Sequence, residues 1–309
     1  MQQVKHYNYI NSPFYKLQYK KQLATLLLIS ENDLDRLEEL TKNKKLYSVF
    51  TVGEKKREIQ TPVHPLLYKA QKRLFELLKR FELPEYVFSG KKGSSSTLNA
   101  KFHQNSKFVL TMDIEHFYAS TRGEFIFQFF FHKLKMASDL AHILTNISTY
   151  RDFSTNVQKI PTGSMLSQLL AFLAYSDIFE SISNFAKENN SIFSLYVDDM
   201  TFSSNYRIPR NFHKKVEERL CSKKLRFKRS KVHYYNDTEY KKITGVIISP
   251  DNKLKVPNKR LKETSISIGK ALSPSATETD KASAIGRINS IKQIDSELFK
   301  NPIKQLTHK

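Results

Sequence analysis

The stretch SLYVDDMTFSS, residues 194–204, places two adjacent carboxylates, Asp198 and Asp199, inside an apolar, β-prone run. The β-forming residues on both sides of the pair predict a tight hairpin with the acids near its bend. Two carboxylates this close repel each other, and burying them is costly unless a cation or a shared proton relieves the repulsion. The stretch therefore predicts a positively charged partner at the bend.

A third acid ends another apolar stretch, KFVLTMDI (107–114), which predicts a buried strand finishing at Asp113. If this strand lies beside the hairpin, three carboxylates converge on one edge of a sheet. Mg²⁺ binds carboxylate oxygens together with substrate phosphates. Two such ions about 4 Å apart stabilise the entering and leaving oxygens of a phosphoryl displacement. An aspartate-rich turn would explain the pair alone, but Asp113 favours a site for two Mg²⁺ ions, with Mn²⁺ as a substitute.

Strands and helices alternate along the rest of the chain. Residues 1–45 read as helical, with a capping-box pattern at Ser30 and Asp33, and a strong amphipathic helix starts at Pro65. Four runs are predicted to form one strand each: KLYSVFTV (45–52), REIQTP (57–62), FKRSKVHYY (227–235) and KKITGVIIS (241–249). A basic helical tail covers residues 252–309. This alternation predicts an α+β fold that sets the acids on a sheet backed by helices.

Composition points to a polyanionic partner. The 309 residues include 51 Lys and Arg against 30 Asp and Glu, a net charge of +21, and nucleic acid is the commonest partner of such a surplus. A basic protein without such a partner is the alternative. The single cysteine, Cys221, excludes an internal disulfide and fits a reducing compartment. Because the apolar runs are short or polar, we expect no membrane contact and a cytoplasmic location.

Several motifs resemble those of reverse transcriptases. YVDD (196–199) resembles their Y-x-D-D box, and MDIEHFYAS (112–120) resembles the first-aspartate motif of their palm domain. The segments that look like the fingers, the stretch before the palm helix and the lysine-bearing strand are REIQTPVHPLLYKAQKRLFELL (57–78), IPTGSMLSQLLAFL (160–173) and FKRSK (227–231). N-A-x-x-H at Asn99, Ala100 and His103, and I-T-G at 243–245, are similar to motifs of bacterial retron reverse transcriptases.

The resemblance implies a right-hand polymerase. An N-terminal helical segment (1–45) would precede fingers (46–106), a palm with an antiparallel sheet backed by helices (107–250) and a helical, RNA-binding thumb (251–309). Asp113 and Asp198 would be the main metal ligands, with Asp199 supporting them and the Ile114 carbonyl completing one coordination sphere. Lys231, or alternatively Lys228, would supply a proton or charge to the departing pyrophosphate.

The resemblance also implies the substrate contacts. Arg57, with Lys55 or Lys56 beside it, would hold the triphosphate of the incoming dNTP, and Tyr118 would exclude a ribose 2′-OH. Gly163 would let the backbone approach the base pair, whereas Thr162 replaces the glutamine usual in the family and leaves its own role open. The residues expected to contact RNA are Asn99, His103, Lys253, Lys255, Lys259, Arg260 and Lys262.

A retron enzyme would bind its own structured non-coding RNA and start DNA synthesis from a guanosine 2′-OH within it. The product would be a single-stranded DNA joined to that RNA, made in anti-phage defence with an effector protein. The chain leaves no room after the thumb for an RNase H domain, so a host RNase H is expected to remove the template. The alternatives are another bacterial reverse transcriptase, without branched priming, and a non-catalytic RNA-binding scaffold.

Overall fold

The computed structural model describes residues 6–41, 46–53 and 56–307. The ends of the predicted 1–45 segment and Lys55 lie outside these ranges. The chain divides into two compact units, each discontinuous in sequence: residues 1–85, 114–182 and 214–227 form the first, and residues 86–113, 183–213 and 228–309 the second. Because these units interleave along the chain, they do not follow the predicted fingers and palm boundaries, which stay a prediction.

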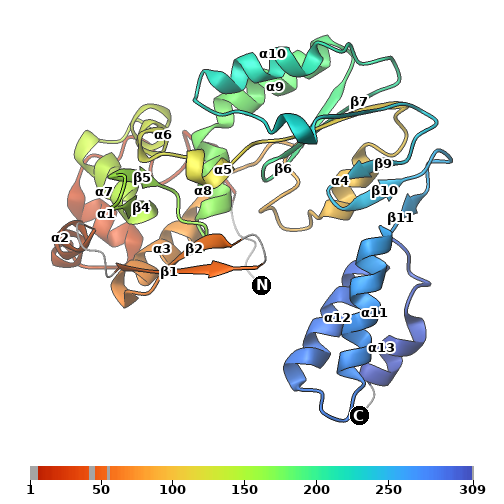
Figure 1. Ribbon diagram of the computed structural model, residues 1–309. Helices are drawn as coiled ribbons and strands as arrows, with labels where there is room; N and C mark the ends of the chain where they lie inside the picture. The colour runs from red at the N-terminus through yellow and green to blue at the C-terminus, as the bar shows by residue number, and fades with distance from the viewer. Residues whose placement is uncertain (1–5, 42–45, 54–55, 308–309) are drawn as a thin grey trace. The chain divides into compact units, whose positions relative to one another are not determined.

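The first unit is mostly helical. Its elements are α1 (Lys20–Leu27), α2 (Glu31–Leu40), β1 (Tyr47–Val52), β2 (Arg57–Pro62), α3 (Pro65–Leu78), α5 (Phe117–Ser120), α6 (Gly123–Gln128), the π-helical turn η2 (Phe129–Lys133), α7 (Ser138–Ser148), β4 (Tyr150–Asp152), β5 (Val157–Lys159) and α8 (Ser167–Ala174). The predicted capping box is present at Ser30 and Asp33, and Pro65 begins α3 as expected. Strands β1 and β2 form an antiparallel hairpin (Figure 1).

The second unit holds a four-stranded antiparallel sheet in the order β6-β7-β3-β8. Its elements are α4 (Ser96–Phe102), β3 (Phe108–Asp113), β6 (Ile192–Tyr196), β7 (Asp199–Ser204), the 3₁₀ turn η3 (Arg229–Lys231), β8 (His233–Tyr235), β9 (Lys241–Ile243), β10 (Val246–Ile248), β11 (Leu254–Lys255), α11 (Asn258–Ala271), α12 (Glu278–Lys292) and α13 (Lys300–Thr307). Two more helices, α9 (Ser176–Glu188) and α10 (Phe212–Cys221), cross the division between the units. Figure 1 shows the hairpin β6–β7 and the helical C-terminal segment α11–α13.

Two predicted strands were wrong in part. The run 227–235 forms a strand only at its end, since residues 229–231 turn as η3 before β8 begins. The run 241–249 is a hairpin of β9 and β10 rather than one strand, with Thr244 and Gly245 as its two-residue loop. Both loop residues have positive φ, 44° and 78°, as a type I′ turn requires, and glycine is the residue that adopts such angles most readily.

The palm-like sheet has two different faces because side chains alternate along each strand. One face is apolar and stacks aromatic rings, with Phe202 packed against Phe193 and Phe212. The other face carries the acids at one end and small hydroxyl side chains, Ser194 and Ser203, toward the other. A buried cluster then closes this polar face: Ala100 of α4, Val109 of β3, and Ile243, Val246 and Ile248 of β9 and β10.

Candidate active site

The three predicted acids meet at one end of the four-stranded sheet. Asp113 is the last residue of β3 and lies directly opposite Asp199, the first residue of β7. Asp198 occupies the bend between β6 and β7, as expected. The main chain at this bend is strained, since Val197 has a φ of 60°, a value that a β-branched residue rarely adopts. The sheet thus brings together carboxylates that are 85 residues or more apart along the chain.

The acids perturb one another strongly. Burial, together with the neighbouring Asp198 and Asp113 carboxylates, raises the pKa of Asp199 to about 7, against an opposing effect of Lys231. A raised pKa means that the folded protein resists holding all three negative charges. The cluster therefore provides oxygen ligands and an excess of negative charge, the combination that a hard divalent cation relieves.

The Lys231 ammonium places a positive charge beside the acids. It donates a hydrogen bond to the Asp113 carboxylate. Burial lowers the pKa of Lys231, but the hydrogen bond and the charge of Asp113 outweigh that effect and raise it overall. Lys228 contacts Asp113 through the main chain, its N–H donating to the Asp113 carbonyl at 2.9 Å. The side chain of Lys231, which stands on the turn η3, is bonded to Asp113.

In the part of the chain that the structure describes, no three His, Cys, Asp or Glu side chains are already arranged to hold a metal ion. The acids instead contact Lys231 and one another: Asp199 and Asp113 are hydrogen-bonded, and Lys231 is on Asp113. The donor chemistry fits a divalent cation, because three carboxylates converge and their mutual repulsion is only partly offset by one ammonium. Ile114, the fourth predicted ligand, is buried and forms an isolated antiparallel β-bridge with Phe227.

The predicted dNTP-binding residues belong to the first unit, and their meeting with the acids stays a prediction. Arg57 is exposed at the start of β2, and Tyr118 lies on α5 against Phe117. The Thr162 side chain is hydrogen-bonded to β2, because its hydroxyl donates to the Glu58 carbonyl at 3.0 Å.

Gly163 lies close to the main chain of β2, and its approach to a base pair stays a prediction. Its N–H donates to the Gln60 carbonyl at 3.0 Å. A Cβ at this position would lie 2.8 Å from that same carbonyl oxygen and 2.5 Å from Thr61 Oγ1. Any residue larger than glycine would therefore push the segment away from β2. The visible role of Gly163 is to seat this segment against the β1–β2 hairpin.

Asn99 and His103, predicted to contact RNA, are both 0% exposed. Asn99 Nδ2 donates to Thr244 Oγ1 at 3.3 Å, so the N-A-x-x-H and I-T-G motifs touch each other. His103 lies against the β6–β7 hairpin, with Nδ1 2.7 Å from Ser203 Oγ on β7 and Nε2 2.7 Å from Ser194 Oγ on β6. Burial lowers the pKa of His103 to about 3, so the ring is neutral. Because both side chains are buried in this structure, their visible role is to pack against the four-stranded sheet and the β9–β10 turn.

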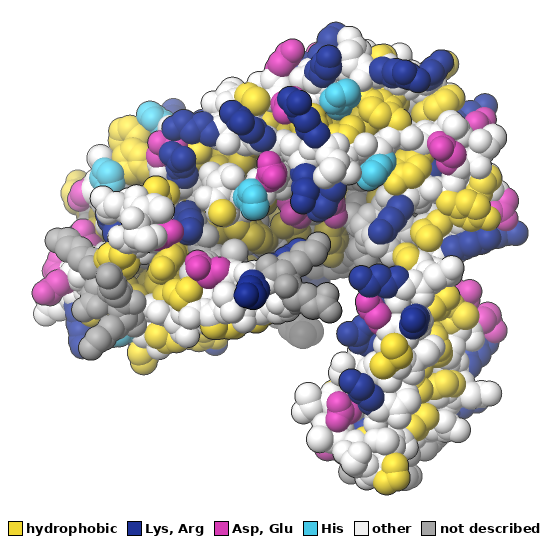
Figure 2. All heavy atoms as spheres, in the orientation of Figure 1, with side chains coloured by type: hydrophobic (Ala, Val, Ile, Leu, Met, Phe, Trp, Pro, Cys, Tyr) yellow, Lys and Arg dark blue, Asp and Glu magenta, His cyan; other side chains and the backbone are white. Residues whose placement is uncertain are grey.

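The predicted RNA-contacting residues of the C-terminal segment lie on its surface with one exception. Lys253, Lys255, Lys259 and Lys262 are exposed. Lys253 pairs with Asp251, Lys259 lies 3.9 Å from Glu263, and Lys255 lies over the Tyr240 ring. Arg260 instead turns toward α12 and hydrogen-bonds Ser290. Figure 2 shows Lys and Arg side chains spread over the face drawn, including the helices α11–α13.

Sequence reasoning missed Ser89. The segment Tyr86–Ser89 runs beside β6: Leu195 N–H donates to the Tyr86 carbonyl at 2.8 Å, and Phe88 N–H to the Leu195 carbonyl at 2.9 Å. Its last residue, Ser89, accepts a hydrogen bond from the strained Val197 N–H at 2.9 Å. The sequence signal was weak, because Ser89 stands in the polar run SGKKGSSS, which reads as a flexible loop.

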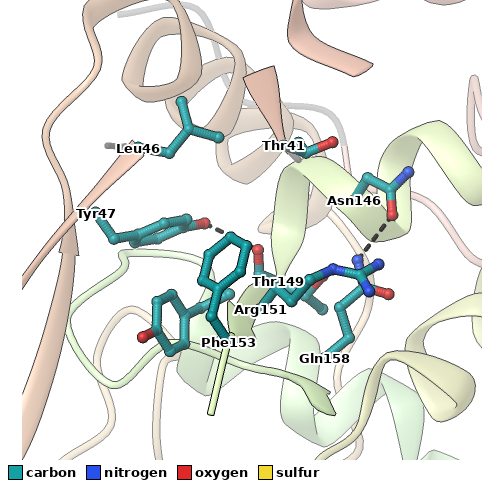
Figure 3. Close-up of a pocket in the computed structure, with 9 residues that line it drawn as sticks. Thr41, Leu46, Tyr47, Asn146, Thr149, Arg151, Phe153 and Gln158 are labelled. Atoms are coloured by element: carbon teal, nitrogen blue, oxygen red, sulfur yellow. Dashed lines mark hydrogen bonds between the residues drawn. The ribbon is translucent and has the colours of Figure 1, made fainter. Parts of the chain in front are cut away.

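A hollow in the first unit is too small to hold a substrate. It measures about 10 Å³, roughly the room of one water, and lies between α7 and strands β1, β4 and β5 (Figure 3). Tyr47 crosses it and donates to the Thr149 carbonyl at 3.2 Å, while Gln158 donates to Asn146 at 2.7 Å. These bonds satisfy the polar groups of the wall, so the hollow is a packing feature.

Comparison with known proteins agrees with this geometry. Residues 54–248 match the family described as reverse transcriptase (RNA-dependent DNA polymerase). The chain belongs to the reverse transcriptase family. The prediction of an RNA-directed DNA polymerase with an α+β fold is thereby confirmed at the level of the family. Reverse transcriptases in general depend on a divalent metal and act on an RNA template.

Several relatives are retron enzymes, as the motifs predicted. The chain is 26% identical over 209 residues to the retron Ec83 reverse transcriptase of Escherichia coli, covering 63% of this chain and 65% of that protein. It is 25% identical over 335 residues to the retron Ec48 reverse transcriptase of Escherichia coli, covering 99% of this chain and 79% of that protein. The chain thus spans slightly less than two thirds of the Ec83 enzyme. Among solved structures, telomerase from Candida albicans with a telomeric RNA fragment matches at 10% identity and a TM-score of 0.48, over 91% of this chain and 59% of that one.

None of the described helices is both long and apolar enough to cross a membrane.

Proposed function

We propose that this reverse transcriptase is a retron RNA-directed DNA polymerase. It binds its own structured non-coding RNA, starts synthesis from a guanosine 2′-OH and extends a single-stranded DNA that stays joined to the RNA. The observation that carries the polymerase assignment is the pairing of Asp113 with Asp199 beside the bend that holds Asp198. The retron assignment is supported by the similarity to retron enzymes and by the N-A-x-x-H and I-T-G motifs.

Asp113, Asp198 and Asp199, with the Ile114 carbonyl, are the residues that would hold two Mg²⁺ ions, or Mn²⁺ in their place. The ions, when bound, supply positive charge to the attacking oxygen and to the departing pyrophosphate. The carboxylates orient that chemistry at the end of a rigid sheet. Lys231, whose ammonium already lies on Asp113, is placed to give charge or a proton to the leaving pyrophosphate.

The first unit supplies the dNTP contacts of this proposal. Arg57 would grip the triphosphate with the planar fork of its guanidinium. The Tyr118 ring would exclude a ribose 2′-OH. Thr162 and Gly163 would affect dNTP binding indirectly, because both hold their segment to β2, the strand that begins at Arg57.

The proposal extends to partners. The exposed lysines at 253, 255, 259 and 262 would contact RNA phosphates, and the loop bases of the RNA would supply sequence specificity. A host RNase H would remove the copied RNA, and an effector protein would join the enzyme in anti-phage defence in the bacterial cytoplasm.

The metal-site claim is tested by Asp198→Asn. We expect Mg²⁺-dependent dNTP incorporation on an RNA template to fall by about two to three orders of magnitude, because a ligand of both ions is lost. Asp139→Asn, an exposed aspartate on α7, is the matched control and should incorporate like wild type. Equal incorporation by the Asp198 variant and wild type would remove these carboxylates from the chemistry. No incorporation by wild type, with RNA binding retained, would favour the scaffold.

Branched priming is tested with the RNA transcribed from the DNA beside the gene. Wild-type enzyme with this RNA and dNTPs should yield DNA that remains attached to RNA through a 2′,5′ bond. Treatment with a debranching enzyme should then release the DNA. A product that is never attached to the RNA would instead assign the chain to another class of bacterial reverse transcriptase.

A further inference from the structure

A second pocket, of about 430 Å³, lies in the unit that holds the acids. Its wall includes Arg207 and Arg210 from the loop after β7, His213 from α10, Tyr234 and Tyr235 from β8, and Glu239. The volume falls in the range of pockets that hold small ligands. Basic and aromatic side chains together are the composition of sites that bind nucleotides.

This pocket is separate from the acid cluster. It reaches the start of β3 at Phe108 and Val109, whereas Asp113 ends that strand. A strand advances about 3.4 Å per residue, so five residues separate the two places by roughly 17 Å. A dNTP held by the acids would not fill this pocket, and the polymerase reaction does not account for it.

The pocket offers two uncompensated positive charges. Arg207 and Arg210 are exposed, and neither guanidinium has an acidic partner among the residues that the structure describes. Glu239 is an acid of the wall, and its carboxylate accepts a hydrogen bond from Asn236 N–H at 2.7 Å. Paired guanidinium groups bind phosphate through parallel hydrogen bonds, which lysine ammonium groups do not reproduce.

The loop that carries the arginines is held in place before any ligand binds. The Tyr234 hydroxyl lies 3.2 Å from the carbonyls of both Pro209 and Arg210 and 3.0 Å from His213 Nδ1. The loop is closed further by Phe212 N–H, which donates to the Pro209 carbonyl at 2.9 Å. Since a loop fixed in this way loses little conformational entropy on binding, the pocket is pre-organised for a ligand.

We propose that this pocket binds one unstacked nucleotide of the RNA, its phosphate on Arg207 and Arg210 and its base against the tyrosine rings. The inference rests on the proposed function, in which the protein binds a structured RNA. Such an RNA presents unpaired loop nucleotides whose bases stack on aromatic side chains. The site would anchor the RNA on the palm-like sheet at a fixed distance from the acids.

The test compares three double variants by fluorescence anisotropy with a labelled single-stranded 12-nucleotide RNA. Arg207→Ala with Arg210→Ala should weaken binding about tenfold and reduce the slope of log Kd against log salt by about 1 to 2. Arg207→Lys with Arg210→Lys keeps the charge but loses the planar fork, and it should weaken binding at least about threefold. Lys69→Ala with Lys72→Ala, two exposed lysines on α3, removes the same charge elsewhere and should leave Kd within about twofold.

If Arg207→Lys with Arg210→Lys binds RNA like wild type, the effect of the arginines is diffuse electrostatics, and the proposal is overturned. A second readout uses the same RNA with 4-thiouridine: irradiation should attach it to the peptide containing Tyr234 and Tyr235 in wild type. Absence of that cross-link would likewise overturn the site. Adenosine monophosphate should displace the RNA only weakly, and tight displacement would assign the pocket to a free nucleotide instead.

These outcomes are independent of the polymerase claim. Incorporation by wild type on poly(rA) primed with oligo(dT) tests the acids, and the arginine variants should match wild type there at saturating template. If wild type shows no incorporation, the proposed function fails while the binding results still judge the pocket. If wild type incorporates dNTPs and the arginine variants bind RNA normally, the pocket inference alone fails.

Discussion

Val197 is held in an unfavourable conformation next to both acids of the hairpin bend. A β-branched residue at φ of 60° costs about 1 to 3 kcal/mol and persists only when its surroundings impose it. The surroundings here include Ser89, which accepts the Val197 N–H from a segment 108 residues away. Ser89 is therefore a positioning residue for the bend.

We expect Ser89→Ala to lower kcat for dNTP incorporation about three- to tenfold with little change in KM for dNTP. The loss corresponds to one hydrogen bond, about 0.5 to 1.5 kcal/mol. Ser89→Thr retains the hydroxyl and should restore most of the rate. Steady-state kinetics on a primed RNA template measure both variants. An alanine variant with wild-type kcat would show that the bend keeps its geometry without this bond.

His103 makes the stability of the folded protein depend on pH. Its pKa falls from 6.5 to about 3 on folding, so between these values the unfolded chain binds a proton that the folded protein does not. Stability from this residue is complete above about pH 6.5 and is lost as pH falls toward about 3, by up to about 1.4 kcal/mol per pH unit.

The measurement is urea unfolding between pH 7.5 and 4.5 for wild type and His103→Gln. Glutamine can hydrogen-bond Ser194 and Ser203 but does not titrate, so the free energy of unfolding of the variant should change less with pH. His132→Gln, at an exposed position, should keep the wild-type pH dependence. Parallel curves for His103→Gln and wild type would contradict the buried, neutral imidazole.

At the scale of elements, the segment before α8 is fitted tightly to the β1–β2 hairpin. Gly163→Ala would place a Cβ within 3 Å of the main chain of β2. We expect the free energy of unfolding to fall by about 1 to 3 kcal/mol, as in other overpacked sites. Thermal unfolding measures the change, and dNTP affinity should weaken with it, because the same strand carries Arg57.

Gly269 provides the matched control for this substitution. It lies inside α11, and a Cβ there meets no atom within 4 Å. Gly269→Ala should therefore stabilise the protein by up to about 1 kcal/mol through its effect on the helix. If both alanine variants change the melting temperature alike, close approach to β2 is not what requires glycine at 163.

The N-A-x-x-H and I-T-G motifs act as one packing unit between elements. Asn99 on α4 contacts Thr244 in the β9–β10 turn, and the Thr244 hydroxyl in turn donates to the Ser96 carbonyl at 3.1 Å. Below them, His103 joins β6 to β7. The two motifs that look specific to the retron branch thus pack together behind the sheet that carries the acids, with Asn99 and His103 both buried.

For the whole molecule, the surplus of positive charge predicts RNA binding that depends strongly on salt. If about 8 phosphates are neutralised, log K should fall with log salt with a slope of roughly −6 to −7. Replacing Lys253, Lys255, Lys259 and Lys262 by alanine should reduce the slope by about 3 to 4, since the surface ion pairs of Lys253 and Lys259 are weak competitors for phosphate. Filter binding of the cognate RNA between 50 and 300 mM NaCl measures both. An unchanged slope would place the RNA away from the C-terminal segment.

Local patterns were enough to predict the elements that the acids need. The alternation around Asp198 and Asp199 specified the β6–β7 hairpin, and Ser30, Asp33 and Pro65 marked the starts of two helices. These features succeed because caps, turns and alternation act between residues that are close along the chain. Charge likewise follows from composition alone, and the repulsion between adjacent aspartates needs no knowledge of distant neighbours.

Tertiary structure alone decided what surrounds each side chain. It buried Asn99 and His103, turned 229–231 so that Lys231 meets Asp113, and brought Ser89 to Val197. These contacts join segments between about 90 and 150 residues apart, and no local window of sequence specifies them. The physical reason is that burial and partner choice depend on which distant segments share a face, whereas a motif records only its own residues.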